Sequence, residues 1–172
     1  MTIRKIVTIP NPILRKHAKK VTTYGKNLKK LVTDMTETLH EANGAGLAAP
    51  QIGVSERVIV LCISENQTTT EIVIVNPEVV KRKGERICKE GCLSIPGYFG
   101  EIKRSDEIKV KGFDCNGKAI RIKGQNLLGQ ALEHEIDHLN GVLYVDHLES
   151  QDKLQKIEPE PKESPAAEPG LD

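Results

Sequence analysis

One short segment, His134-Glu135-Ile136-Asp137-His138, limits what this chain can fold into more than any other feature. Apolar residues recur around it at three- and four-residue steps, at Leu127, Leu128, Ala131, Leu132, Ile136 and Leu139. This spacing predicts a helix that is at least partly buried, begins at Gly124 or Gln125, and ends at Asn140-Gly141. On such a helix the imidazoles of His134 and His138 lie on one face, one turn apart.

Two imidazoles in this arrangement can bind one divalent ion, and Glu135 can reach a water molecule on that ion. The same string also arises by chance on charged helices, with both histidines in solvent. Buried histidine and glutamate side chains need polar partners, however, and a metal with its water supplies them. The helix therefore predicts a metal site with a base beside it. A catalytic site of this kind takes three protein ligands, so one ligand must come from elsewhere.

The chain has four cysteines, at Cys62, Cys88, Cys92 and Cys115. Cys92 is the best candidate for the third ligand, because it lies between Gly91 and Pro96-Gly97, where the backbone can approach an ion closely. We expect Cys62 and Cys115 to be small buried hydrophobes, whereas Cys88 could have either role. The sequence shows no signal-peptide pattern and no membrane-spanning run, which predicts free thiols in a reducing cytosol.

Length and charge narrow the class of protein further. The 172 residues suit one domain with a core, which we place at residues 1–150. Residues 151–172 are rich in Glu, Pro and Lys without apolar spacing, and this predicts a disordered tail. The formal net charge of +1 gives no reason to expect nucleic acid or an anionic membrane as a partner.

The remaining patterns predict an α+β fold. An apolar stripe at Leu28, Leu31, Val32, Met35 and Leu39 predicts an amphipathic helix over residues 26–42. Strands are predicted at 57–62, 71–75, 78–80, 107–113, 118–123 and 141–145. Asn116-Gly117 predicts a hairpin between two of them. Because helices and strands do not alternate, we expect antiparallel β-sheets packed around a central metal-binding helix, with the amphipathic helix at the N-terminal side.

A glycine-rich segment, GAGLAAPQ at residues 44–51, fits neither an ordinary helix nor an ordinary loop. It lacks the lysine and the strand–helix context of a phosphate-binding loop, so the pattern gives little support to nucleotide binding. Its free backbone groups can instead pair with an extended peptide, as an added strand would. The amide of Gln51 can donate a hydrogen bond to an oxyanion.

Three motifs together resemble one family. GAGLAAPQ at residues 44–51, EGCLS at 90–94 and EHEIDHLNG at 133–141 occur in the order and at the separations found in peptide deformylase. The resemblance covers residues 3–148, nearly everything except the tail. It implies a metal-dependent hydrolase that removes the formyl group from the N-terminal N-formylmethionine of newly synthesised proteins and releases formate.

The resemblance also assigns roles to residues. It implies that Cys92, His134 and His138 are the metal ligands, that Glu135 is the catalytic acid and base, and that Gln51 and the backbone N–H of Leu93 stabilise the oxyanion. It further implies that the bound peptide and its methionine pocket are flanked by Gly44, Ala45, Gly46, Glu90 and Gly91.

The metal, the partners and the location follow from the same resemblance. The ion in the cell is expected to be Fe²⁺, with Zn²⁺, Ni²⁺ or Co²⁺ able to occupy the site. The partners are expected to be N-formylmethionyl peptides of nascent chains, at the ribosome, in a cytoplasm of bacterial type.

Some positions depart from the family pattern. Phe99 stands where many members have arginine, and Glu133 stands where glutamine is more common, which puts one peptide contact and the tuning of His134 in question. Gln130 and Ala131 also differ from several members, so side-chain preference does not carry over. His17, His40 and His147 match no family ligand and are expected at the surface or with satisfied hydrogen bonds.

Two other functions compete with this one. A metallopeptidase with the same helix normally takes its third ligand from downstream, where only His147 and acidic residues such as Asp146 and Glu149 are found, without a motif. A structural metal domain, or an inactive peptide-binding relative, more often has four protein ligands. Release of formate from a formyl-Met peptide separates these classes from a deformylase.

Overall fold

The computed structural model describes residues 2–65 and 68–157 of the chain. Within them lie two α-helices, α1 (Lys26–Glu41) and α2 (Asn126–Leu139). The strands are β1 (Gly46–Ala48), β2 (Val58–Glu65), β3 (Thr68–Lys83), β4 (Arg86–Cys92), β5 (Ile95–Arg104), β6 (Glu107–Phe113), β7 (Ala119–Gln125) and β8 (Leu154–Lys156). Short 3-10 turns connect them: η1 (Pro12–Arg15), η2 (Ala49–Ile52), η3 (Tyr144–His147) and η4 (Gln151–Lys153).

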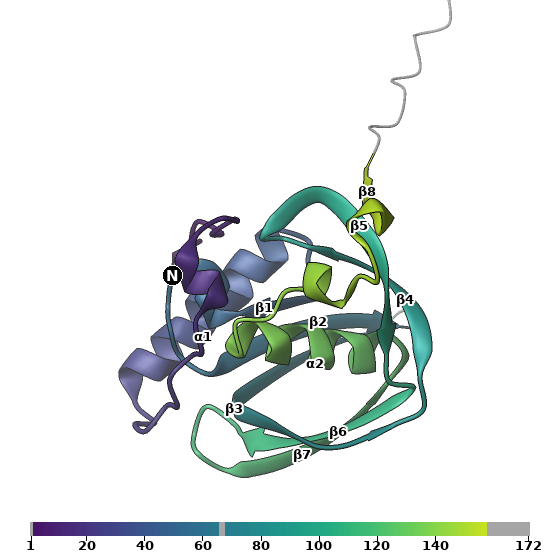
Figure 1. Ribbon diagram of the computed structural model, residues 1–172. Helices are drawn as coiled ribbons and strands as arrows, with labels where there is room; N and C mark the ends of the chain where they lie inside the picture. The colour runs from purple at the N-terminus through teal and green to yellow at the C-terminus, as the bar shows by residue number, and fades with distance from the viewer. Residues whose placement is uncertain (1, 66–67, 158–172) are drawn as a thin grey trace, which may run out of the picture.

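The strands form two antiparallel sheets, which confirms the predicted α+β class. One sheet has five strands in the order β1-β2-β3-β6-β7, and the other has three in the order β4-β5-β8. The predicted hairpin joins β6 to β7, and Gly117 in its turn has φ +84°, a conformation that glycine adopts without strain. Figure 1 shows α2 in the middle of the fold, with strands of both sheets around it.

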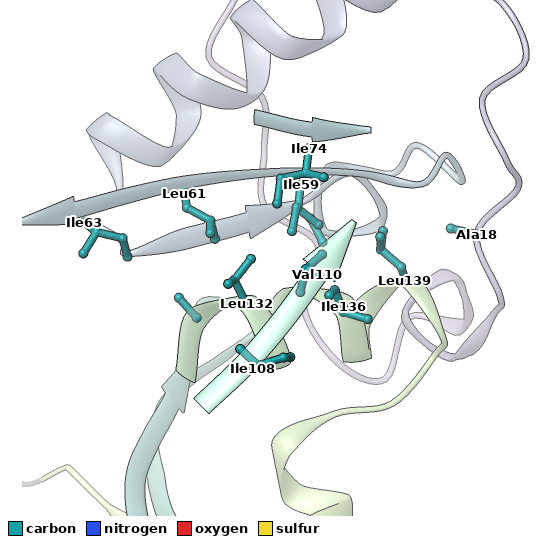
Figure 2. Packing of buried hydrophobic residues seen from close by; sticks show 12 residues of the cluster. Ala18, Ile59, Leu61, Ile63, Ile74, Ile108, Val110, Leu132, Ile136 and Leu139 are labelled. Atoms are coloured by element: carbon teal, nitrogen blue, oxygen red, sulfur yellow. The ribbon is translucent and has the colours of Figure 1, made fainter. Parts of the chain in front are cut away.

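Alternation along β2 explains why the five-stranded sheet carries a helix on each face. Its odd-numbered residues Ile59, Leu61 and Ile63 join Leu132, Ile136 and Leu139 of α2 in one cluster, as Figure 2 shows. Its even-numbered residues Val58 and Val60 pack instead with Met35 and Leu39 of α1. Because successive side chains of a strand point to opposite faces, α1 and α2 cover opposite sides of the sheet. Each of these buried aliphatic side chains contributes roughly 1.5–3 kcal/mol through burial.

The helix ends agree with their sequence signals. Helix α2 begins after Gln125 and ends at Leu139, followed by Asn140 and by Gly141 at φ +72°. A Cβ on Gly141 would lie 2.5 Å from the carbonyl oxygen of Arg15, so both the conformation and the space require glycine here. Helix α1 matches its predicted range to within one residue.

Several predicted strand boundaries are wrong. The strands predicted at 71–75 and 78–80 are parts of one strand, β3, which has an irregular register with β6 between Val75 and Glu78. No strand was expected at β4 or β5, because Gly91, Pro96 and charged residues interrupt their apolar pattern. The strand predicted at 141–145 is absent: Gly141 reverses the chain, and the following turn η3 is closed by Asp146 Oδ2, which accepts a hydrogen bond from Leu143 N at 2.8 Å.

The predicted boundary of the tail at Gln151 is also wrong. Residues 151–153 form η4, and β8 follows this turn and pairs with Tyr98–Gly100 of β5. Leu154 is partly buried and packs on the small core beneath the three-stranded sheet. This apolar contact fixes β8, although the polar composition of the segment gives no sign of it. The rest of the predicted tail, residues 158–172, lies outside the described residues. Within the described part of the chain, every helix is too short or too polar to serve as a membrane span.

Candidate metal centre

The three predicted metal ligands meet at one point of the fold. His134 and His138 lie one turn apart on α2, and Cys92 lies at the end of β4, over the same face of the helix. The ligand atoms of the three residues lie within 4.8 Å of one another, and His138 Nε2 lies 3.2 Å from Cys92 Sγ. Two elements far apart in the sequence therefore bring one thiol and two imidazoles together.

This donor set fits a metal ion. His134 Nδ1 lies 2.8 Å from Glu90 Oε2, which fixes the ring and leaves Nε2 as the nitrogen available to an ion. His138 is 1% exposed, and its Nδ1 has no hydrogen-bond partner among the described residues. Two imidazole nitrogens and one thiolate suit Fe²⁺, Zn²⁺, Ni²⁺ or Co²⁺, and three protein ligands leave a coordination position open.

A buried ion-pair network fixes the position of Glu90, the hydrogen-bond partner of His134. Arg104 donates to both carboxylate oxygens of Glu90, at 2.7 and 2.9 Å, and to Asp137 Oδ2 at 2.7 Å. Burial alone would raise the pKa of Glu90, but the hydrogen bonds with His134 and Arg104 lower that pKa to about 2. Glu90 is therefore an ionised partner for His134. Sequence reasoning gave no role to Asp137 and did not single out Arg104. No local motif marks Arg104, because its position depends on how β4 pairs with β5.

Glu135 lies on the neighbouring face of α2 with an unusual degree of burial. Glu135 is only 3% exposed, and its Oε2 has no hydrogen-bond partner among the described residues. Burial raises the pKa of Glu135 to about 7. A carboxyl group with a pKa near neutrality can both accept and return a proton, as an acid–base catalyst must.

The side chain of Gln51 is fixed toward the same centre. Its Oε1 accepts a hydrogen bond from Ala48 N at 2.8 Å, which sets the orientation of the amide. The opposite atom, Nε2, then points to Ser94 Oγ at 3.2 Å and to Cys92 Sγ at 3.7 Å. A fixed N–H donor beside the candidate metal ligands is what stabilisation of an oxyanion requires.

A pocket of about 400 Å³ opens onto these groups. All five residues expected to bind the peptide line it, as do Gln51, Leu93, Cys92, His134 and Glu135. Sequence reasoning gave no pocket role to four other lining residues, Tyr98, Leu127, Pro96 and Ile157. One wall comes from the segment around β1 and the other from β4 and the start of β5.

The departures from the family pattern have structural explanations. Glu133 points away from the metal ligands: it accepts hydrogen bonds from Arg82 Nε at 2.8 Å and from the backbone N–H and hydroxyl of Ser105 at 2.9 and 3.1 Å. Phe99 lies under the ammonium group of Lys89, which is 3.6 Å from the ring centroid. Gln130 lines the pocket and donates to the carbonyl oxygen of Lys89.

The other histidines and cysteines do not line the pocket. His17, His40 and His147 are exposed, as expected, and His147 Nε2 bonds to Asp137 at 2.8 Å. All four thiols are free. Cys62 and Cys115 are only half-buried, which corrects the expectation of buried hydrophobes, whereas Cys88 is buried in β4 without lining the pocket.

Comparison with known proteins shows the family to which this chain is similar. A family model described as Polypeptide deformylase matches residues 3–154. A peptide deformylase from Dehalococcoides mccartyi is 52% identical over 160 residues, which are 93% of this chain and 95% of the relative. A peptide deformylase from Thermomicrobium roseum is 41% identical and spans 99% of both chains.

Solved structures show the same fold. The crystal structure of a peptide deformylase from Legionella pneumophila has a TM-score of 0.84 at 48% identity, over 88% of this chain and 89% of that one. A peptide deformylase from Ehrlichia chaffeensis, solved in complex with actinonin, has a TM-score of 0.84 at 40% identity, over 89% and 92% of the two chains. The chain therefore belongs to the peptide deformylase family, metal-dependent hydrolases that remove the formyl group from the N-terminal N-formylmethionine of newly synthesised proteins.

Proposed function

We propose that Cys92, His134 and His138 hold the metal ion of this deformylase, and that Glu135 is its acid–base catalyst. The convergence of the three ligand atoms within 4.8 Å, beside a buried carboxyl group, is the observation that carries this proposal. When bound, the ion supplies a Lewis acid that polarises the formyl carbonyl and lowers the pKa of water. Glu135 takes a proton from the attacking water and returns it to the leaving amine.

The oxyanion that develops on the formyl group needs donors beside the ion. Gln51 Nε2 is held in place through Ala48, and Leu93 follows Cys92 directly at the pocket wall. We assign both the Gln51 amide and the Leu93 backbone N–H to this charge. A fixed donor at such a position contributes roughly 10²- to 10³-fold to the rate.

The substrate backbone fits between two sheet edges. In the described residues, β1 is the edge strand of the five-stranded sheet and β4 is the edge strand of the three-stranded sheet. Gly44, Ala45 and Gly46 line the pocket on one side, and Glu90 and Gly91 line it on the other. An extended formyl-Met peptide can add to the β1 edge through backbone hydrogen bonds and place its N-terminal side chain in the pocket.

We extend this proposal to the metal ion used in the cell and to the place where the reaction occurs. We assign Fe²⁺ as the cellular ion, as the family resemblance implies, and Zn²⁺, Ni²⁺ or Co²⁺ as substitutes, because a thiolate with two imidazoles also suits those ions. Nascent chains at the ribosome, in the cytoplasm, are the proposed substrates, because formylmethionine begins newly made chains. The catalytic unit comprises the part of the chain before residue 151 together with β8.

Anaerobic purification tests the ligand set. Wild type, a Cys92→Ser variant and a Cys115→Ser control are analysed for metal content and for formate release from a formyl-Met tripeptide. Cys115 is a half-buried free thiol in the β6–β7 turn, so its replacement leaves the site intact. Loss of metal or activity in Cys92→Ser alone is expected. Wild-type turnover with normal metal content in Cys92→Ser would refute the ligand assignment.

A further inference from the structure

A second group of metal-binding side chains lies on the side of the five-stranded sheet that faces α1. His40, Cys62 and Glu71 each offer one ligand atom, and these three atoms all lie within 4.8 Å of one another. None of the three lines the catalytic pocket. The group therefore needs an explanation separate from the deformylase centre.

The register of the sheet brings these residues together. Cys62 continues the even-numbered side of β2 that Val58 and Val60 present to α1. Glu71 of β3 is the direct cross-strand partner of Cys62, so the two side chains emerge on the same face, next to each other. His40 lies in the last turn of α1, and its Nε2 is 2.8 Å from Glu71 Oε1. Three elements thus aim a nitrogen, a sulfur and an oxygen at one point.

These donors select the kind of ion. Mg²⁺ and Ca²⁺ prefer oxygen ligands alone, and the thiol and imidazole argue against them. A carboxylate is a poor ligand for Cu(I), which prefers sulfur. Zn²⁺ accepts cysteine sulfur, histidine nitrogen and carboxylate oxygen in one tetrahedral shell. With a thiolate and a carboxylate, the charge of the ion is balanced.

The side chains are free to adjust to an ion. With Zn–ligand distances of about 2.0–2.3 Å, tetrahedral ligand atoms lie roughly 3.3–3.7 Å apart. The three ligand atoms lie within 4.8 Å of one another, and the side chains of His40 and Glu71 are 48% and 52% exposed. Rotation of these two side chains closes the remaining gap without disturbing the core. Cys62, half-buried on its strand, supplies the fixed ligand.

We propose that His40, Cys62 and Glu71 form a second metal site, which binds one Zn²⁺ ion with water in the fourth position. The site lies next to the wall of the catalytic pocket. The backbone N–H of Cys62 donates to the carbonyl oxygen of Ala45 at 2.9 Å, and Ala45 lines that pocket. Gly44, Ala45 and Leu127 also line the groove of about 560 Å³ that holds His40, Cys62 and Glu71. A zinc ion bound to Cys62 is therefore connected, through the backbone hydrogen bond from Cys62 to Ala45, to the segment that precedes β1.

The test uses the holoenzyme with Ni²⁺ in the catalytic centre, so that the two metals can be counted separately. Zn²⁺ is added under anaerobic conditions with a reductant that contains no thiol, and both metals are measured per chain after dialysis against a fixed concentration of free zinc. Wild type is expected to keep its nickel and to take up a further equivalent of zinc. Cys62→Ser and Glu71→Gln are expected to bind that zinc more than about tenfold more weakly, while Cys115→Ser binds it as wild type does.

Thiol reactivity supplies a second readout. Zinc is expected to protect Cys62 from alkylation in the nickel enzyme, and mass spectrometry of the peptides identifies the protected residue. Equal zinc uptake by wild type and Cys62→Ser would overturn the proposal. Replacement of nickel by zinc without an additional equivalent would overturn it as well. If Cys62→Ser does not fold, zinc uptake by Glu71→Gln and His40→Gln, which change exposed side chains, decides the question. Uptake equal to that of wild type in both variants would overturn the proposal.

Discussion

Gly46 lies directly against the carboxylate of Glu135. A Cβ on Gly46 would come within 2.5 Å of Glu135 Oε1 and 2.8 Å of its Cγ, closer than real side-chain atoms approach one another. The strand that forms one wall of the pocket therefore also confines the side chain assigned as the acid–base catalyst. Glycine at position 46 leaves the space in which that carboxyl group sits.

A Gly46→Ala substitution is expected to impair catalysis more than stability. The added methyl group displaces the Glu135 carboxylate, and a misplacement of about 1 Å can lower the rate about 10²-fold. Formate release by the metal-loaded variant measures kcat and KM, and thermal unfolding measures stability. The matched control is Gly25→Ala, where a Cβ meets no atom within 4 Å. An unchanged kcat in Gly46→Ala would show that the position of Glu135 does not depend on this contact.

Glu135 is expected to destabilise the metal-free protein at alkaline pH. Burial raises its pKa from 4.5 to about 7, so the folded protein keeps a proton that the unfolded chain has already released. The penalty is absent below about pH 4.5, grows as the pH rises, and is complete above pH 7. Metal-free Glu135→Gln is therefore expected to be more stable than metal-free wild type at pH 8, by roughly 3 kcal/mol.

Urea unfolding of the metal-stripped proteins between pH 5 and 8 measures this difference. The gain in Glu135→Gln should shrink steadily toward the acidic end of the range. Glu41→Gln, at the exposed end of α1, is the control and should show no comparable gain. A stability difference that is the same at every pH would mean that Glu135 does not carry this proton.

Arg104 is expected to be essential for stability. Its side chain is 4% exposed and bridges two carboxylates, Glu90 and Asp137. An Arg104→Met substitution leaves both carboxylates without their cation in a buried place, which typically costs 3–5 kcal/mol, so we expect a loss of about that size in the free energy of unfolding. Lys103→Met is the matched control, because Lys103 is 54% exposed in its pair with Glu85. A loss below about 1 kcal/mol in Arg104→Met would contradict the prediction.

Local geometry decided how much of the candidate site could be predicted. The spacing of His134, Glu135 and His138 is enough to place two ligands and a base on a helix, because helix geometry acts over a few residues. The glycines around Cys92 gave a candidate third ligand in the same way. The position of Arg104 depends on the long-range pairing of β4 with β5, and no local pattern reports that pairing.

The fold shows the same division. Both helices and the β6–β7 hairpin have strong local signals in apolar spacing and in Asn116-Gly117. Strands β4, β5 and β8 alternate buried and charged residues irregularly, and contacts with distant parts of the chain stabilise them. Leu154 is one such residue: it packs on the core beneath the three-stranded sheet, although its neighbours look like part of a polar tail.

The role of Glu135 is tested most directly by formate release from a formyl-Met tripeptide by anaerobically prepared Glu135→Gln at the same metal content as wild type. Because Gln has the size of Glu but cannot transfer a proton, we predict that the variant keeps its metal and loses about 10²- to 10⁴-fold in kcat/KM. Undiminished formate release by a metal-replete Glu135→Gln would contradict the account.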